Sequence, residues 1–137
     1  MQSHLPSYEI VVVENSPNLN SILERTPNKH CSGISRKVSA KACLETMRDA
    51  VYLVDLMLED MDGLSLIEEI RMRKPDIPVI AFIATTSTPD FELEEQALRK
   101  MAFQSGANAL FIAPLNLGEI VGTLDRLALE YQAEAVA

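Results

Sequence analysis

The stretch Val51–Leu64 has the sequence VYLVDLMLEDMDGL and carries the clearest strand, turn and helix pattern of this chain. Its first four residues are apolar without alternation, which is typical of a strand buried on both faces of a parallel sheet. Asp55 follows with no turn residue between, so we expect its carboxylate at the carboxyl end of that strand. Gly63 then ends a polar turn. A helix as far as Lys74 is predicted by apolar residues at helical spacing: Leu64, Ile67 and Ile70.

The alternation of apolar strand and helical pattern continues on both sides of this stretch. Four further buried strands are predicted at 10–13, 31–35, 79–83 and 109–112, of which 31–35 has the weakest pattern. Helices are predicted over 18–25 after Pro17, over 40–47 with Ser39 as cap, and after Asn116 as far as Tyr131. Strands and helices in this order predict a three-layer α/β sandwich around a parallel sheet. We expect one domain over 1–137 with its core at about 8–130.

The remaining helix lies between the fourth and fifth strands. Ser87 or Thr88 is its expected cap, Pro89 lies in its first turn, and Gly106 ends it. Glu95 and Arg99 stand at the spacing of an ion pair within one helix. The pattern predicts one apolar face made of Phe91, Leu98, Met101 and Ala102.

Composition excludes several classes of function. Twenty acidic residues against twelve basic ones give a formal net charge of -8, so no overall field attracts nucleic acid or an anionic membrane. The first residues lack the pattern of a signal peptide, and the longest apolar run, 77–84, is too short to span a membrane. We expect a cytoplasmic protein that contacts neither nucleic acid nor a membrane. Cys31 and Cys43 fit no metal-ligand spacing and are expected to be buried free thiols.

A second carboxylate, Glu14, follows the first predicted strand, and neighbouring carboxylates at one sheet edge are typical of a cation site or a reactive acid. The segment Asp55–Gly63 resembles the phospho-acceptor segment of the response-regulator receiver family of two-component signalling. The first strand with its acidic end, and the fifth strand with the proline at 114, are similar to that family too. The resemblance covers about 8–130. It implies a flavodoxin-like (βα)5 fold with the strand order 2-1-3-4-5.

The resemblance also implies a role for each matching position. Asp55 stands at the phospho-acceptor position, which would take phosphoryl from a histidine kinase. The Mg²⁺ positions are Glu14, Asn15, Asp55 itself and the Met57 backbone carbonyl. Mg²⁺ is the one cofactor that the resemblance implies. Because the family has a second acid where Asn15 stands, we expect this chain to bind Mg²⁺ weakly. The resemblance further implies a cis peptide bond before Pro114.

Three more positions depart from the family pattern. Ala113 replaces the lysine, Ile83 the hydroxyl residue and Leu110 the aromatic switch residue. Lys41 and Lys100 are expected on outer helix faces, where neither replaces the missing lysine. Thr85 or Thr86 would supply the hydroxyl only if the predicted strand register were shifted by two residues.

These departures favour a receiver-like domain that binds protein or dimerises independently of phosphorylation. The alternative is a competent receiver phosphorylated on Asp55 with Mg²⁺, which at most catalyses its own phosphorylation and is otherwise no enzyme. Flavin or nucleotide binding on the same fold is disfavoured because Glu14 stands where a phosphate would need amides. The partner, a histidine kinase, a downstream effector or a second copy, is expected on the fourth helix, fifth strand and fifth helix. Residues of that face are Phe91, Arg99, Lys100 and Gln104.

Overall fold

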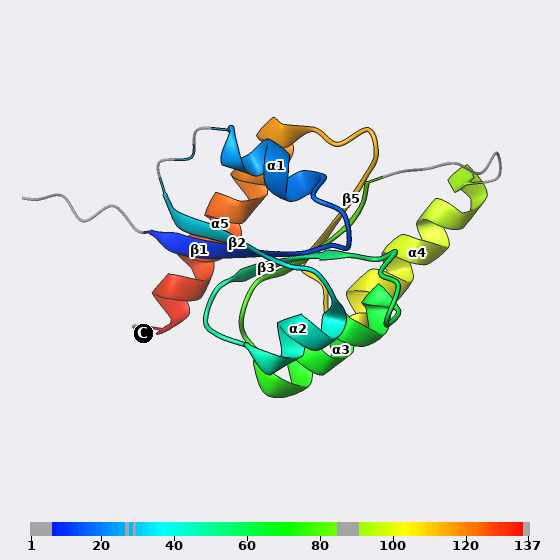
Figure 1. The fold of residues 1–137 in the computed structure, drawn as a ribbon, viewed down its shortest axis with the longest axis horizontal. Helices are drawn as coiled ribbons and strands as arrows, with labels where there is room; N and C mark the ends of the chain where they lie inside the picture. The colour runs from blue at the N-terminus through cyan, green and yellow to red at the C-terminus, as the bar shows by residue number, and fades with distance from the viewer. Residues whose placement is uncertain (1–6, 27, 29, 85–90, 136–137) are drawn as a thin grey trace, which may run out of the picture.

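The computed structural model describes residues 7–26, 28, 30–84 and 91–135, with the backbone alone over 91–94. Five strands alternate with five helices along the chain (Figure 1). The strands are β1 (Tyr8–Val13), β2 (Cys31–Lys37), β3 (Val51–Asp55), β4 (Val79–Ile83) and β5 (Ala109–Ile112). The helices are α1 (Leu19–Glu24), α2 (Ala40–Glu45), α3 (Gly63–Arg73), α4 (Phe91–Ser105) and α5 (Leu117–Ala135).

All strand pairings are parallel, and the sheet order is β2-β1-β3-β4-β5. Helices α1 and α5 pack on one face of the sheet and α2, α3 and α4 on the other, so the predicted flavodoxin-like (βα)5 three-layer sandwich is confirmed (Figure 1). Every residue of β4 and the first four of β3 are buried, as their unbroken apolar runs predict. Strand β2 has the weakest pattern because it lies at the sheet edge, where Ser32 and Gly33 are exposed.

The edge position of β2 also corrects one expectation about the cysteines. Both thiols are free, but only Cys43 is buried, whereas Cys31 at the start of the edge strand is half-buried. Burial raises the pKa of the Cys43 thiol to about 11, which makes it a poor nucleophile near neutral pH.

The apolar face of α4 also differs from the prediction. Ala102 is fully buried and Leu98, one turn earlier, packs against the same core, but 46% of Met101 is exposed. The reason is geometric, since neighbouring residues on a helix point about 100° apart and Ala102 takes the inward direction. The side chain of Phe91, and the expected cap residues Ser87, Thr88 and Pro89, lie outside what the structure describes.

The helix ends lie where the capping and turn residues of the sequence predict them. The Ser39 hydroxyl accepts from the Ala42 amide at 3.1 Å, and the Asn116 Oδ1 accepts from the Glu119 amide at 3.1 Å, so both predicted caps are confirmed. Gly106 ends α4 with a φ of 116°, a left-handed conformation that favours glycine. Among the helices that the structure describes, none is long and apolar enough to cross a membrane.

Candidate functional site

The candidate site lies at the carboxyl edge of the sheet. Val13 of β1 pairs in parallel register with Val54 of β3, so Glu14 and Asp55 follow neighbouring strands at the same level. Ala113 follows β5, which is bound to β4 through the Ala113 amide and the Ile83 carbonyl at 2.9 Å. The strand order therefore brings the acids of β1 and β3 together, as the sequence predicts.

Glu14 is fully buried, and its carboxylate caps α1. Oε2 accepts from the Leu19 amide at 3.0 Å and Oε1 accepts from the Asn20 amide at 2.9 Å. Helix α1 needs this cap because Asn18, the residue before it, makes no side-chain cap bond. Burial raises the pKa of Glu14, while the two amides and the nearby Arg36 guanidinium act in the opposite direction.

Asn15 connects three loops of this edge. Its Nδ2 donates to the Val38 carbonyl between β2 and α2 at 2.9 Å, and its Oδ1 accepts from the Glu59 amide between β3 and α3 at 2.9 Å. The Asn15 carbonyl also accepts from the Arg36 guanidinium. An amide can donate and accept at once, which an ionised carboxylate cannot do. Asn15 therefore has a structural role that the aspartate of the family pattern could not fill.

Asp55 is half-buried at the tip of β3. Its Oδ1 accepts from the Met57 amide at 2.8 Å, a bond that lowers its pKa, but burial outweighs it and raises the pKa above the ordinary value. The Met57 side chain points to solvent, with 68% of its surface exposed. The carboxylate of Asp55 thus has one oxygen without a hydrogen bond to the described residues, whereas both oxygens of Glu14 are bonded.

The loop after Asp55 is fixed by Asp60, a residue to which sequence analysis gives no role of its own. Its two carboxylate oxygens each accept at 3.1 Å, one from the Ala40 amide and the other from the Lys41 amide, so Asp60 caps α2 across the sheet edge. These bonds lower the pKa of Asp60. An aspartate in a turn gives no local signal of a helix twenty residues earlier in the chain, which is why the pattern missed it.

Gly63 is required because a side chain there would collide with the neighbouring backbone, and not because its backbone adopts a positive φ. It begins α3 without a positive φ, and a Cβ there would lie 2.5 Å from the Leu56 Cα and 2.6 Å from the Asp55 carbonyl oxygen. Only glycine lets the helix start against the backbone that carries the acceptor position. Asp62 caps the same helix, accepting from the Leu64 amide at 3.2 Å.

The other family positions carry no charged or hydroxyl group in this chain. Ile83 and Leu110 are buried in the core beneath α3 and α4, and Ala113 is half-buried. The Ala113–Pro114 peptide bond is cis, as the resemblance implies. Lys41 is exposed beside Glu45, and Lys100 is exposed on α4, while Thr85 and Thr86 fall outside the described residues.

The described residues therefore leave few oxygen atoms at this edge that are free to bind a divalent cation. Both oxygens of Glu14 are used by α1, the Asn15 Oδ1 by the Glu59 amide, and one oxygen of Asp55 by the Met57 amide. Within the described ranges no three His, Cys, Asp or Glu side chains are grouped so as to hold a metal ion. Asp55 and the Met57 carbonyl are the remaining candidate ligands, and two ligands are few for a cation that prefers six oxygens.

The residues expected on the partner face lie on α4 beside β5. The Arg99 guanidinium donates to the Leu110 carbonyl at 3.1 Å and to the Glu95 carboxylate at 3.2 Å, so the predicted Glu95–Arg99 pair is confirmed. Arg99 thus ties α4 to β5 in addition to its expected place on the face. Lys100 and Gln104 are exposed, as is half of Phe103, which sequence analysis did not single out.

Comparison with known proteins agrees with this architecture. The family described as "Response regulator receiver domain" matches residues 10–124. Similar curated proteins include the transcriptional regulatory protein CssR of Bacillus subtilis, 28% identical over 88% of this chain and 51% of that protein. The DNA-binding transcriptional regulator NtrC of Klebsiella pneumoniae is 27% identical over 90% of this chain and 25% of its own length. This chain therefore spans about half or less of these relatives.

Solved structures give the same fold at lower identity. A signal receiver domain of a putative Luxo repressor protein from Vibrio parahaemolyticus superposes with a TM-score of 0.74 and 18% identity, covering 95% of this chain and 96% of that one. The Francisella response regulator 1452 receiver domain gives a TM-score of 0.71 and 19% identity, covering 90% of this chain and 98% of that one. At such identity the likeness shows the fold alone.

Proposed function

Because the chain belongs to the response regulator receiver domain family of two-component signalling, we propose that it is a receiver whose output does not require phosphorylation of Asp55. In this proposal it acts as a cytoplasmic protein-binding or dimerisation module. The family assignment gives the signalling role. The hydrogen bonds of Glu14 and Asn15 at the carboxyl edge of the sheet support an output that is independent of phosphorylation.

The observation that carries the proposal is the use of Glu14 and Asn15 as structural groups. Glu14 is buried as the cap of α1, and Asn15 holds three loops together through both ends of its amide. Moving either side chain to a cation would break these bonds. The residues present therefore do not fit Mg²⁺ well, and the proposed function does not depend on it.

The missing lysine weakens phosphoryl transfer independently of the metal. In place of a cation near the phosphoryl group the chain has Ala113, and a unit charge pair about 4 Å apart contributes on the order of 4 kcal/mol at an effective dielectric constant near 20. Phosphoryl transfer depends on positioning and on stabilising negative charge, so this loss slows the reaction steeply.

Transmission of a phosphorylation signal is also impaired. Ile83 and Leu110 are buried aliphatic side chains that can form no hydrogen bond with a phosphoryl group. Their packing under α3 and α4 favours one arrangement of β4 and β5. A face held in one arrangement suits constitutive binding of a protein partner, either a histidine kinase, a downstream effector or a second copy.

A second candidate function is ordinary phosphorylation of Asp55. The observation that favours it is the half-buried Asp55 carboxylate, of which only Oδ1 is held, by the Met57 amide. Its Oδ2 could attack a phosphohistidine, forming the acyl phosphate while the histidine of the kinase leaves. Both functions use the same fold and differ in whether Asp55 is needed.

Exchange of single residues in the organism's own copy separates the two functions. Asp55→Ala is expected to leave the signalling output intact, whereas Lys100→Glu, an exposed change on α4, is expected to reduce it. Glu59→Gln, an exposed acid beside the Asp55 site, serves as a matched control. Loss of output with Asp55→Ala and full output with Lys100→Glu would overturn the proposal.

A further inference from the structure

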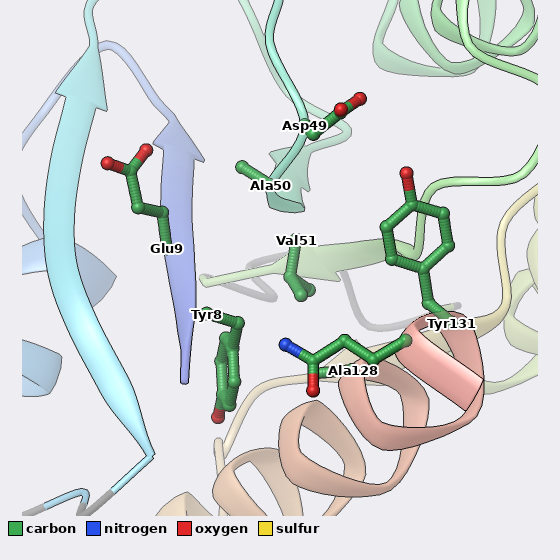
Figure 2. A pocket seen from close by; sticks show the side chains of 8 residues that line it. Tyr8, Glu9, Asp49, Ala50, Val51, Ala128 and Tyr131 are labelled. Atoms are coloured by element: carbon green, nitrogen blue, oxygen red, sulfur yellow. The ribbon is translucent and has the colours of Figure 1, made fainter. Parts of the chain in front are cut away.

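A cavity of about 170 Å³ lies at the amino end of the sheet, the opposite edge from Asp55 (Figure 2). It opens between the first residues of β1, the residues that lead into β3, and the last turns of α5. Figure 2 shows the rings of Tyr8 and Tyr131 on two sides of Val51. None of the positions assigned to the Asp55 site contributes to this cavity.

The floor of the cavity is apolar and buried. It is formed by Ala50, Val51 and Ala128, which are at most 6% exposed. The Tyr8 hydroxyl donates to the Asp125 carboxylate at 2.6 Å and accepts from the Asn28 amide at 2.9 Å, so the Tyr8 ring is held in place beside this floor. Such a floor suits the methylene groups of a long side chain.

The polar groups at the cavity are negative or neutral. Glu9 and Asp49 bring carboxylates, Tyr131 a phenol and Gln132 an amide, and among the lining residues that the structure describes there is no lysine or arginine. The Gln132 amide is already used, because it donates to the Ser7 carbonyl at 2.7 Å. The charge of the lining therefore matches a cation rather than an anion.

Both carboxylates remain within reach of a ligand. Their side chains are 45% exposed for Glu9 and 68% exposed for Asp49, and they pair with Arg48 at 2.8 Å and Lys74 at 3.0 Å at the surface. Exposed ion pairs of this kind contribute little to stability and are exchanged readily. An incoming cation can share or replace these partners without loss of the fold.

We propose that this cavity binds one arginine side chain presented by a partner protein. Its volume is below the range of about 300–1,000 Å³ typical of drug-sized ligands and close to an engineered cavity of about 150 Å³ that holds benzene, so it suits one side chain. The arginine stem lies on the apolar floor, and its planar guanidinium stacks on the Tyr131 ring while it bonds Asp49. The net charge of -8 favours the approach of such a basic segment.

The test uses a capped arginine tripeptide, Ac-Gly-Arg-Gly-NH₂, titrated into the whole chain and followed by amide NMR. The matched ligand has citrulline in place of arginine, since citrulline has nearly the same shape without the charge. Asp49→Asn is the diagnostic variant, because its exposed side chain can change without unfolding the protein. Glu59→Gln, which removes one negative charge at the opposite edge of the sheet, is the matched control.

The arginine peptide is expected to give saturable shifts at Ala50, Val51 and Gln132. Binding is expected to be at least fivefold weaker for the citrulline peptide and for Asp49→Asn, and unchanged for Glu59→Gln. Shifts that spread over the acidic surface without saturating would overturn the proposal. Equal binding of the citrulline peptide, or equal loss in Asp49→Asn and Glu59→Gln, would overturn it as well.

Discussion

Replacement of Glu14 by alanine tests whether this carboxylate belongs to the fold or to a metal site. The variant leaves the Leu19 and Asn20 amides without their acceptor at a fully buried position. A hydrogen bond to a charged group contributes about 1.5–3 kcal/mol, and the raised pKa of Glu14 shows that burial of its charge offsets part of two such bonds. We expect the free energy of unfolding to fall by about 2–4 kcal/mol.

Thermal unfolding followed by circular dichroism, in buffer with EDTA, measures this loss. At about 3–4 °C per kcal/mol for a chain of this length, the midpoint should fall by about 6–16 °C. Glu14→Gln keeps one acceptor oxygen and is expected to lose about half as much. Glu59→Ala is the control, because its carboxylate is exposed and has no hydrogen bond or ion pair among the described residues. A change below about 2 °C in Glu14→Ala would refute the capping role.

Three further variants test the remaining contacts of the site. Burial raises the pKa of Asp55, so its ionisation favours the unfolded chain and the free energy of unfolding falls as the pH rises from about 4 towards neutrality. Asp55→Asn should remove this loss and raise the melting midpoint at neutral pH. A lower midpoint at neutral pH would show that Asp55 has a favourable charge partner. Asp60→Ala removes the two hydrogen bonds that Asp60 accepts from the Ala40 and Lys41 amides, while the Ser39 cap of α2 remains. It should cost about 1 kcal/mol in urea unfolding, whereas an unchanged midpoint would mean that water replaces the lost bonds. Gly63→Ala places a methyl group 2.5 Å from the Leu56 Cα, so we expect a loss of about 3 kcal/mol or more, and a loss under 1 kcal/mol would show that the loop yields.

The parts of the fold that sequence analysis predicted are those with a local or repeated signal. The buried strands, the position of Asp55 and the end of α4 at Gly106 all follow from apolar runs and turn residues within a few positions. The strand order and the cis bond before Pro114 came from the family resemblance. Local patterns carry this information because backbone geometry is set over short distances along the chain.

The roles of Glu14, Asn15 and Asp60 could not be predicted in the same way. Asn15 and Asp60 bond backbone groups that the tertiary fold brings near, up to 44 positions away for the Glu59 amide from which Asn15 accepts. Glu14 instead bonds amides only five and six positions further along the chain. The family resemblance places Glu14 at a metal position, and nothing in the local sequence shows that α1 begins without a side-chain cap of its own. Met101 was misplaced for a related reason, since neighbouring helix positions differ in direction although both are apolar.

The central proposal, an output independent of Asp55 phosphorylation, is tested most directly by an amide NMR titration of the whole chain with Mg²⁺ and beryllofluoride, which mimics the acyl phosphate. We expect no saturable shifts at Asp55, Met57 or Ala84 at millimolar Mg²⁺, and no change at Leu110 or Lys100. Saturable shifts at Asp55 that extend to Leu110 and Lys100, and that disappear in Asp55→Asn, would contradict the proposal and show a working phospho-acceptor.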